Sequence, residues 1–333
     1  MSLLWRQPIK GVWITLLSVL LTWITYLFMI EYAKCTLDAF MAWICIAFSV
    51  MWITGFSLQR WPASKIKNPL LSSISAIIFQ SCMAVIVGFV MFGIVFNYWG
   101  LPLTVVFSYE FFRSIVSIAT PWAVTAIFFW SLQYFYAGNA LAKYAGIANK
   151  QPIEGIMTWL VQLGLATLVV GGGYFLGLSL YVPWIWFPIV CIQLVQFDGW
   201  PISKVSEGAR TIYNLAITVF LSGVYWYLLD LCGIPFTSLP GQLHAIILTV
   251  WAVGWPWVFN NWPLRGIRTQ PLKGIVQFIF VIVCTEVSYW INVHLLSVNL
   301  YLSVILWFTW IYWAIILCWH CTCFTRGYEK SPL

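Results

Sequence analysis

The residues best placed for chemistry are ionisable side chains inside long apolar segments. Glu286 lies in the middle of the apolar segment 275–296, within the sequence Cys-Thr-Glu-Val-Ser-Tyr. A charged group at the centre of a bilayer costs about 3 kcal/mol or more, so it usually faces protein or water. Tyr289 follows three residues later, which places both side chains on one helix face within hydrogen-bonding reach. Two interpretations remain open: a proton, cation or substrate site, or a protonated carboxyl group bonded to a neighbouring span.

A second candidate pair lies in the apolar segment 104–118. Glu110 and Arg113 are three residues apart, so on a helix they can neutralise each other. The simpler interpretation is an interfacial amphipathic turn with both charged groups in water. The alternative is a pair that lines a polar cavity beneath a kink at Pro121. Glu110 and Arg113 are therefore secondary candidates for substrate or ion binding, after Glu286 and Tyr289.

The remaining reactive side chains do not match a known catalytic or metal-binding pattern. The histidines His244, His294 and His320 are scattered, whereas membrane di-metal and haem sites need several in paired spacing. The cysteine cluster at 318–323 is too compressed for structural zinc. Phosphate-binding loops, dinucleotide fingerprints and hydrolase nucleophile elbows do not occur in the sequence. We therefore expect no catalytic residue, no metal and no cofactor, and we expect a protein that is not an enzyme.

The composition is that of a membrane protein. Of the 333 residues, 62% are hydrophobic and only 8% are charged, whereas a soluble domain has about 25% charged residues. Apolar runs of roughly 20 residues are typical of membrane spans. The formal charge of +7 comes from basic residues in short loops beside these runs, as the positive-inside rule expects. We therefore predict contact with the lipid bilayer and no nucleic-acid partner.

The apolar segments predict an all-α integral membrane protein of about ten transmembrane helices. Their approximate ranges are 11–33, 38–58, 70–98, 119–137, 156–179, 181–197, 211–231, 244–259, 275–296 and 301–319. Fourteen of the 16 Lys and Arg residues fall near the two termini or in the loops after even-numbered spans. This asymmetry predicts a plasma or inner membrane protein with both termini in the cytoplasm.

Two short loop sequences recur between the spans. Trp-Pro-Ala-Ser-Lys-Ile at 61–66 returns in related form at 200–205 and 262–267, and Gln-Pro-Ile-Lys-Gly at 7–11 returns at 151–155 and 270–274. Proline disfavours helix at the residue before it and suits the first turn of the next helix. We therefore expect Trp-Pro to end one helix and Gln-Pro to begin another, although a docking surface for a partner or lipid stays open.

This recurrence predicts five like-oriented helical hairpin repeats within one polytopic membrane domain, 1–333. The units are expected at approximately 7–62, 68–140, 151–201, 207–263 and 270–325. The second unit is the longest and contains the charged pair described above.

These features favour a permease or transporter for a small solute, with proton or cation coupling at Glu286 as an open feature. The alternative is a non-catalytic anchor or scaffold subunit of a larger membrane complex, which has other membrane subunits or further copies of the chain as partners. A third class is an enzyme that acts on lipid, which requires a carboxylate-lined cavity open sideways to the bilayer. A water-accessible Glu286 favours the transporter, and a dry, packed Glu286 favours the scaffold.

Overall fold

The computed structural model describes residues 7–96, 125–126, 129, 140–176, 182–296 and 299–319, which form helices and short loops with no strand among them. The main helices are α1 (Ile9–Leu27), α2 (Leu37–Phe56), α3 (Pro69–Phe96), α7 (Ile153–Phe175), α8 (Val182–Cys191), α9 (Glu207–Leu231), α10 (Leu239–Thr249), α12 (Leu272–Trp290) and α13 (Leu300–Trp319). Four π-helical segments extend these helices: η2 (Phe28–Tyr32), η5 (Ile192–Gln196), η7 (Val250–Gly254) and η9 (Ile291–Leu295). The short helices are α6 (Ala140–Tyr144) and α11 (Trp255–Phe259), which follows η7.

Seven of the described helices are long and apolar enough to cross a membrane. They begin with α1, α3, α7, α9, α10, α12 and α13, and α2 and α8 lie where two further spans are predicted. The described part of the chain is thus all-helical, and its apolar helices indicate embedding in a membrane. The predicted span 119–137 lies almost entirely outside the described residues, as do Glu110 and Arg113.

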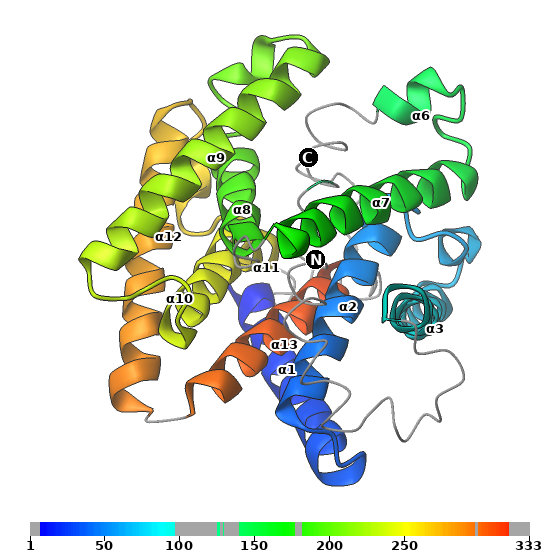
Figure 1. Cartoon of the computed structure of the whole chain (residues 1–333), viewed down its shortest axis with the longest axis horizontal. Helices are drawn as coiled ribbons and strands as arrows, with labels where there is room; N and C mark the ends of the chain where they lie inside the picture. Colours follow the sequence, from blue (N-terminus) through cyan, green and yellow to red (C-terminus); the bar gives the residue numbers. More distant parts are fainter. Residues whose placement is uncertain are drawn as a thin grey trace.

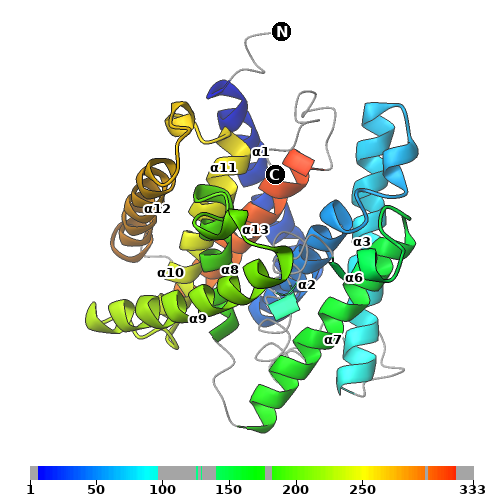
Figure 2. The same ribbon diagram turned by 90° about the horizontal axis from the view of Figure 1, so that it is seen from above.

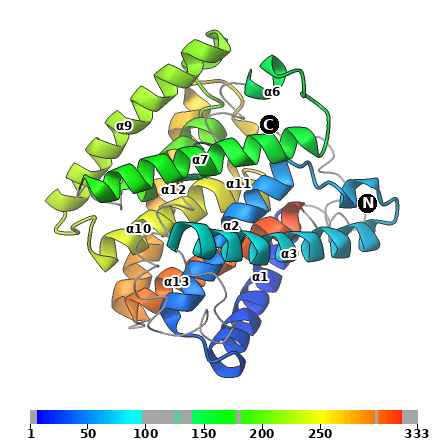
Figure 3. The same cartoon turned by 45° about the vertical axis from the view of Figure 1, so that its right-hand side comes forward.

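The helices form an inner group and an outer group (Figures 1 and 2). Of the apolar window in Leu239–Phe259, 83% is buried, and of that in Leu300–Trp319, 61%. The corresponding share is only 17% to 33% in the spans that begin with α1, α3, α7, α9 and α12. Inner helices contact one another in the order α2, α13, α10, α8, while α1 packs on α13, α9 on α8 and α12 on α10. Figure 3 shows α3 and α7 on either side of α2, and both contact it.

One narrow stripe of each outer helix is buried, with residues at four-residue spacing. The stripe residues are Ile14, Ser18 and Thr22 on α1; Ala76, Gln80 and Ala84 on α3; Thr158, Gln162 and Ala166 on α7; Asn214, Thr218 and Ser222 on α9; and Gln277, Val281 and Thr285 on α12. Most of them are small or polar, which suits close helix contact inside a membrane. The hydroxyl groups bond within their own helix, as in Ser18 Oγ donating to the Ile14 carbonyl at 2.7 Å.

The remaining surface of the outer helices is apolar. On α1, large exposed side chains include Trp13, Leu16, Leu20, Trp23 and Leu27. A soluble protein rarely exposes contiguous apolar surface on this scale. Polar groups turned inward and apolar groups turned outward are the arrangement that a hydrocarbon environment favours.

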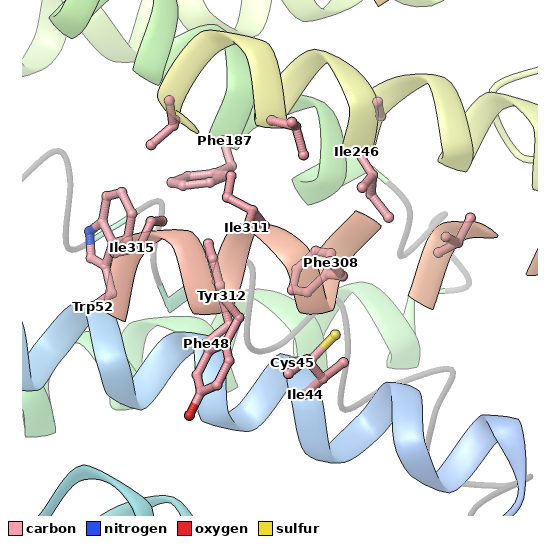
Figure 4. Close-up of a cluster of buried hydrophobic side chains, with 14 of the residues drawn as sticks. Ile44, Cys45, Phe48, Trp52, Phe187, Ile246, Phe308, Ile311, Tyr312 and Ile315 are labelled. Carbon is pink, nitrogen blue, oxygen red and sulfur yellow. The ribbon is translucent and has the colours of Figure 1, made fainter. Parts of the chain in front are cut away.

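Aromatic rings fill the described centre of the inner group (Figure 4). The ring centroids of Phe48 and Phe308 are 5.0 Å apart. Trp257 lies 5.2 Å from Trp52 and 4.5 Å from Trp319. These distances are typical of packed aromatic pairs. The part of the centre that the structure describes is therefore a packed core rather than a path for water.

The three Trp-Pro loops have the same backbone conformation. In each loop the Trp-Pro bond is cis and the proline φ is −84°. A 3₁₀ turn follows each proline: η3 (Ala63–Lys65), η6 (Ile202–Lys204) and η8 (Leu264–Gly266). Two left-handed residues stand before each tryptophan: Gln59 and Arg60, Asp198 and Gly199, and Asn260 and Asn261. The similar sequences thus have similar local structures.

The prediction that Trp-Pro itself ends the incoming helix is wrong in position. The helices end at Phe56, Gln196 and Phe259, three to five residues before the tryptophan. The left-handed residues end them, because that backbone conformation cannot continue a right-handed helix. The Gln-Pro expectation is confirmed, since α1, α7 and α12 each begin one residue after the proline.

Each Gln-Pro segment docks on a Trp-Pro loop that belongs to another part of the chain. The glutamine Nε2 donates to the carbonyl four residues before the tryptophan: Gln7 to Val258 at 2.9 Å, Gln151 to Ser57 at 2.8 Å, and Gln270 to Gln196 at 3.0 Å. The three docking contacts are therefore equivalent in position and in donor and acceptor.

A glycine makes each docking contact possible. An added Cβ would lie 2.2 Å from the Phe259 ring at Gly11, 2.5 Å from the Leu58 side chain at Gly155, and 2.2 Å from the Phe197 ring at Gly274. Such separations are far below van der Waals contact. The glycine of the Gln-Pro-x-x-Gly pattern is therefore a packing requirement.

Candidate functional site

The structure places Glu286 against a histidine from another helix. Glu286 is on α12, and its Oε1 lies 2.9 Å from Nε2 of His244 on α10. The His244 side chain is 3% exposed, whereas the Glu286 side chain is 55% exposed. The carboxylate is thus held by a buried imidazole and still reaches the outside of the helix group.

Tyr225 on α9 extends this contact to a third helix. Its hydroxyl oxygen lies 2.6 Å from His244 Nδ1. The imidazole therefore has a partner at both nitrogens, one on each neighbouring outer helix. The Tyr225–His244–Glu286 chain joins α9, α10 and α12 through two consecutive hydrogen bonds.

The predicted partner of Glu286, Tyr289, has a different role. The hydrogen bond that the structure gives Glu286 comes from His244. The Tyr289 ring packs edge-on against the His244 ring, with centroids 5.2 Å apart and an interplanar angle of 64°. Tyr289 therefore covers the imidazole, and the groups that face His244 are two tyrosines and one carboxylate.

The Tyr225–His244–Glu286 chain can keep both of its hydrogen bonds in two different protonation states. With neutral His244, the Tyr225 hydroxyl donates to Nδ1 and the Nε2–H donates to a Glu286 carboxylate, which gives a net charge of −1. With one more proton, the imidazolium donates from Nδ1 to the Tyr225 oxygen and from Nε2 to the carboxylate, and the net charge is zero. The same geometry therefore holds a proton or leaves one negative charge for another cation.

The Tyr225–His244–Glu286 chain lies in one half of the predicted membrane thickness, away from the Trp-Pro loops. Along the helix axes, Tyr225 is about 9 Å from the end of α9 and His244 about 8 Å from the start of α10. Glu286 is about 14 Å from the end of η9. Burial of charge at this depth is expensive unless it is paired, and His244 provides that pairing when it is an imidazolium.

A tight turn sets the position of His244. The Ser238 Oγ accepts from the Gly241 N–H at 3.4 Å and caps the start of α10. An added Cβ on Gly241 would lie 2.6 Å from the Pro235 carbonyl oxygen, so the turn requires glycine here. His244 follows this turn by three residues and therefore enters the bundle at a fixed depth.

An apolar groove with a volume of about 410 Å³ runs between α9 and α12. These helices lie at the left of Figure 1. The lining residues of the groove are Ile189, Ile192, Gln193, Phe197, Gly199, Trp200, Pro201, Ile202, Asn214, Ile217, Leu221, Val224, Tyr225, Leu228, Leu248, Phe278 and Ile282. Val224, Leu228 and Phe278 are exposed, so this lateral groove opens sideways. The volume is within the range of roughly 300–1,000 Å³ found for small-molecule sites.

The Tyr225–His244–Glu286 chain lies beside one end of the lateral groove. Tyr225 lines the groove directly. Phe278 and Ile282 form the α12 wall, and Glu286 continues their helix face at the next four-residue step. From Asn214 to Leu228, the α9 wall extends over about 21 Å. The site thus combines a long apolar surface with one ionisable group near its end.

Sequence reasoning found Glu286 but missed His244 and Tyr225. In the sequence His244 is one of three scattered histidines, although an intramembrane histidine is itself a functional signal. The pairing joins residues that are 42 positions apart, so no local spacing reveals it. Glu110, Arg113, His320 and most of the 318–323 cluster lie outside the described residues.

No protein-family model, curated protein or solved structure matches the chain.

Proposed function

We propose that the protein is a membrane transporter that exchanges protons for a small cationic solute with an apolar body. The Tyr225–His244–Glu286 chain binds either the proton or the cation, and the lateral groove holds the apolar part. The observation that carries this proposal is a half-exposed carboxylate, bonded to a buried histidine, at the end of an apolar groove.

Charge balance supports exchange rather than simple binding. With neutral His244 the Tyr225–His244–Glu286 chain carries one negative charge, which attracts a cation. When these residues hold one more proton their net charge is zero and the attraction is lost, so the proton and the cation compete for one site. A site of this kind couples proton binding to cation binding without requiring a water-filled path through the aromatic centre.

The side opening supports an amphiphilic solute that enters from the bilayer. The groove walls are apolar over more than one leaflet, since the hydrocarbon core is about 30 Å thick. An amphiphile with its charged group near Glu286 and its chain toward the Trp-Pro loops matches this polarity. The lateral opening also provides what a lipid-directed enzyme would need, but the exchange function accounts for both protonation states.

The proposal includes the topology that the sequence predicts. Ten spans in five like-oriented hairpins place the Trp-Pro loops and both termini in the cytoplasm of a cell with a plasma or inner membrane. The three equivalent docking contacts support the repeat, because similar sequences make the same hydrogen bond and the same glycine contact.

Cys232 tests this topology. It is exposed and caps the end of α9 opposite the Trp-Pro loops. In a variant that keeps Cys232 as its only cysteine, we expect a membrane-impermeant maleimide to label intact cells. The matched control carries Ser64→Cys, at an exposed position of the first Trp-Pro loop, in place of Cys232, and this variant should label only after permeabilisation. The reverse pattern would contradict the orientation.

Binding of radiolabelled dodecyltrimethylammonium to the protein in lipid nanodiscs tests the function. We expect saturable binding of this cation. Dodecyl sulfate and dodecyl maltoside, which have the same alkyl chain, should not compete with it. The affinity should increase with pH, by up to about tenfold per unit, because the proton-free form binds the cation. Above the titration range the affinity should reach a plateau.

Two outcomes would contradict the proposal. Equal competition by all three detergents would show that the groove binds chains without regard to charge. Native mass spectrometry of gently solubilised protein that finds a stable complex with another subunit, together with no cation binding, would support the scaffold alternative.

A further inference from the structure

A second cavity lies beside the Trp-Pro loop at 262–267, where α12 begins. Its volume is about 190 Å³. Its lining residues are Asn261, Arg265, Ile267, Arg268, Lys273 and Gln277. Lys273 and Glu286 are 13 residues apart on one helix, a rise of about 20 Å. This basic cavity is therefore separate from the site proposed for transport.

Two of the three cations in the basic cavity keep an unbalanced charge. The Lys273 Nζ lies 2.8 Å and 2.7 Å from the two carboxylate oxygens of Asp198, and its side chain is 17% exposed. Arg265 and Arg268 are exposed, and neither takes part in an ion pair with another described residue. The lining together with Asp198 thus carries two net positive charges.

The basic cavity also contains buried amide groups without hydrogen-bond partners. Gln277 is 0% exposed, and neither its Oε1 nor its Nε2 has a partner among the described residues. The Oδ1 of Asn261 is likewise buried and unpaired. Unpaired buried polar groups are rare in native proteins and call for a specific explanation. A ligand that accepts a hydrogen bond would provide the missing partner of the Gln277 Nε2, and a hydroxyl group on the same ligand would donate to the amide oxygens.

The other two Trp-Pro loops differ at these positions. Arg265 takes the place of Ser64 and Ser203, the fourth residues of the equivalent loops. Gln277 lies seven residues after Gln270, where the other Gln-Pro segments are followed by Ile14 and Thr158. Arg265 and Gln277 therefore depart from the shared pattern, whereas Arg268 and Lys273 align with Lys67 and Lys10.

We propose that the basic cavity binds a phosphate group. Two guanidinium groups present paired N–H donors that match phosphate oxygens, and the buried Gln277 Nε2 supplies a further donor. The N-terminal end of α12 adds a favourable dipole. The phosphate comes from a lipid headgroup or from a soluble phosphate, and basic pockets at the ends of membrane helices bind lipid headgroups in this way.

Calorimetry on the delipidated protein tests this site with two probes, dihexanoyl phosphatidylglycerol and inorganic phosphate. We expect the double variant Arg265→Ser, Arg268→Ser to weaken binding at least about tenfold, as expected for the loss of charged hydrogen bonds. Gln277→Leu should weaken it without any change of charge. The control variant Lys65→Ser, Lys67→Ser removes two charges beside the equivalent first loop and should leave affinity unchanged.

The outcomes separate the sources and the alternatives. Binding of the phosphatidylglycerol probe alone assigns the site to a lipid headgroup, and binding of both probes assigns it to phosphate in general. Equal losses in the arginine and lysine variants would overturn the proposal, because they would indicate unspecific surface attraction. Failure of both probes to bind the folded wild-type protein would also overturn it, and neither result bears on the transport site.

Discussion

Replacing Glu286 by glutamine is expected to weaken binding of dodecyltrimethylammonium about 30-fold, or about 2 kcal/mol. Glutamine keeps an oxygen that accepts the His244 Nε2–H at the position where Oε1 now lies, 2.9 Å away. The hydrogen-bonded chain is therefore retained while its negative charge is lost. The variant should bind the cation weakly at every pH, because no carboxylate remains to balance the charge of the cation.

The control for this variant is Glu31→Gln. Glu31 is also exposed, at 66%, but lies on η2 beside Lys34 and far from the lateral groove in sequence. Its replacement should leave affinity and pH dependence unchanged. If both variants bind like the wild type, or both lose binding equally, Glu286 is not the cation site. Thermal stability measured in parallel shows whether either variant has simply failed to fold.

Replacing Gly274 by valine is expected to destabilise the protein by about 3 kcal/mol, near the upper range for overpacking. The Cβ would lie 2.2 Å from the Phe197 ring, so the start of α12 must move away from its Trp-Pro loop. This movement would also break the hydrogen bond from Gln270 to the Gln196 carbonyl. We expect the melting temperature of the solubilised protein to decrease by roughly 4 °C.

Two companion variants make this prediction specific. Gly164→Val on α7 places its Cβ in open space, and should have little effect on the melting temperature. Phe197→Leu combined with Gly274→Val should recover part of the loss, because the smaller side chain makes room for the new methyl groups. Equal destabilisation at Gly164 and Gly274, or no recovery in the double variant, would contradict the docking role.

The apolar pattern of the sequence predicted most of the helices correctly. The long apolar runs give helices such as α1, α9 and α12 near their predicted bounds, because length and hydropathy determine which segments fit a membrane. The ends before the Trp-Pro loops were less predictable. Two consecutive left-handed residues end these helices, and residue types such as those of Gln59 and Arg60 do not predict a positive φ.

Contacts between distant segments were beyond what the sequence could show. The recurring glutamines pointed to helix starts, but the docking of Gln7 on Val258 spans 251 positions. The same limit applies to the site. Glu286 was identifiable as a lone intramembrane carboxylate, whereas its pairing with His244 depends on which helices pack together. The lateral groove likewise forms from four helices and has no signature in any one of them.

Proton release on cation binding tests the central claim most directly. Dodecyltrimethylammonium is added to the protein in weakly buffered nanodiscs that contain a pH indicator, across a series of starting pH values. Exchange at the Tyr225–His244–Glu286 chain predicts a release that approaches one proton per bound cation at low pH and falls to zero as pH rises. Saturable cation binding with no proton release at any pH would contradict the account.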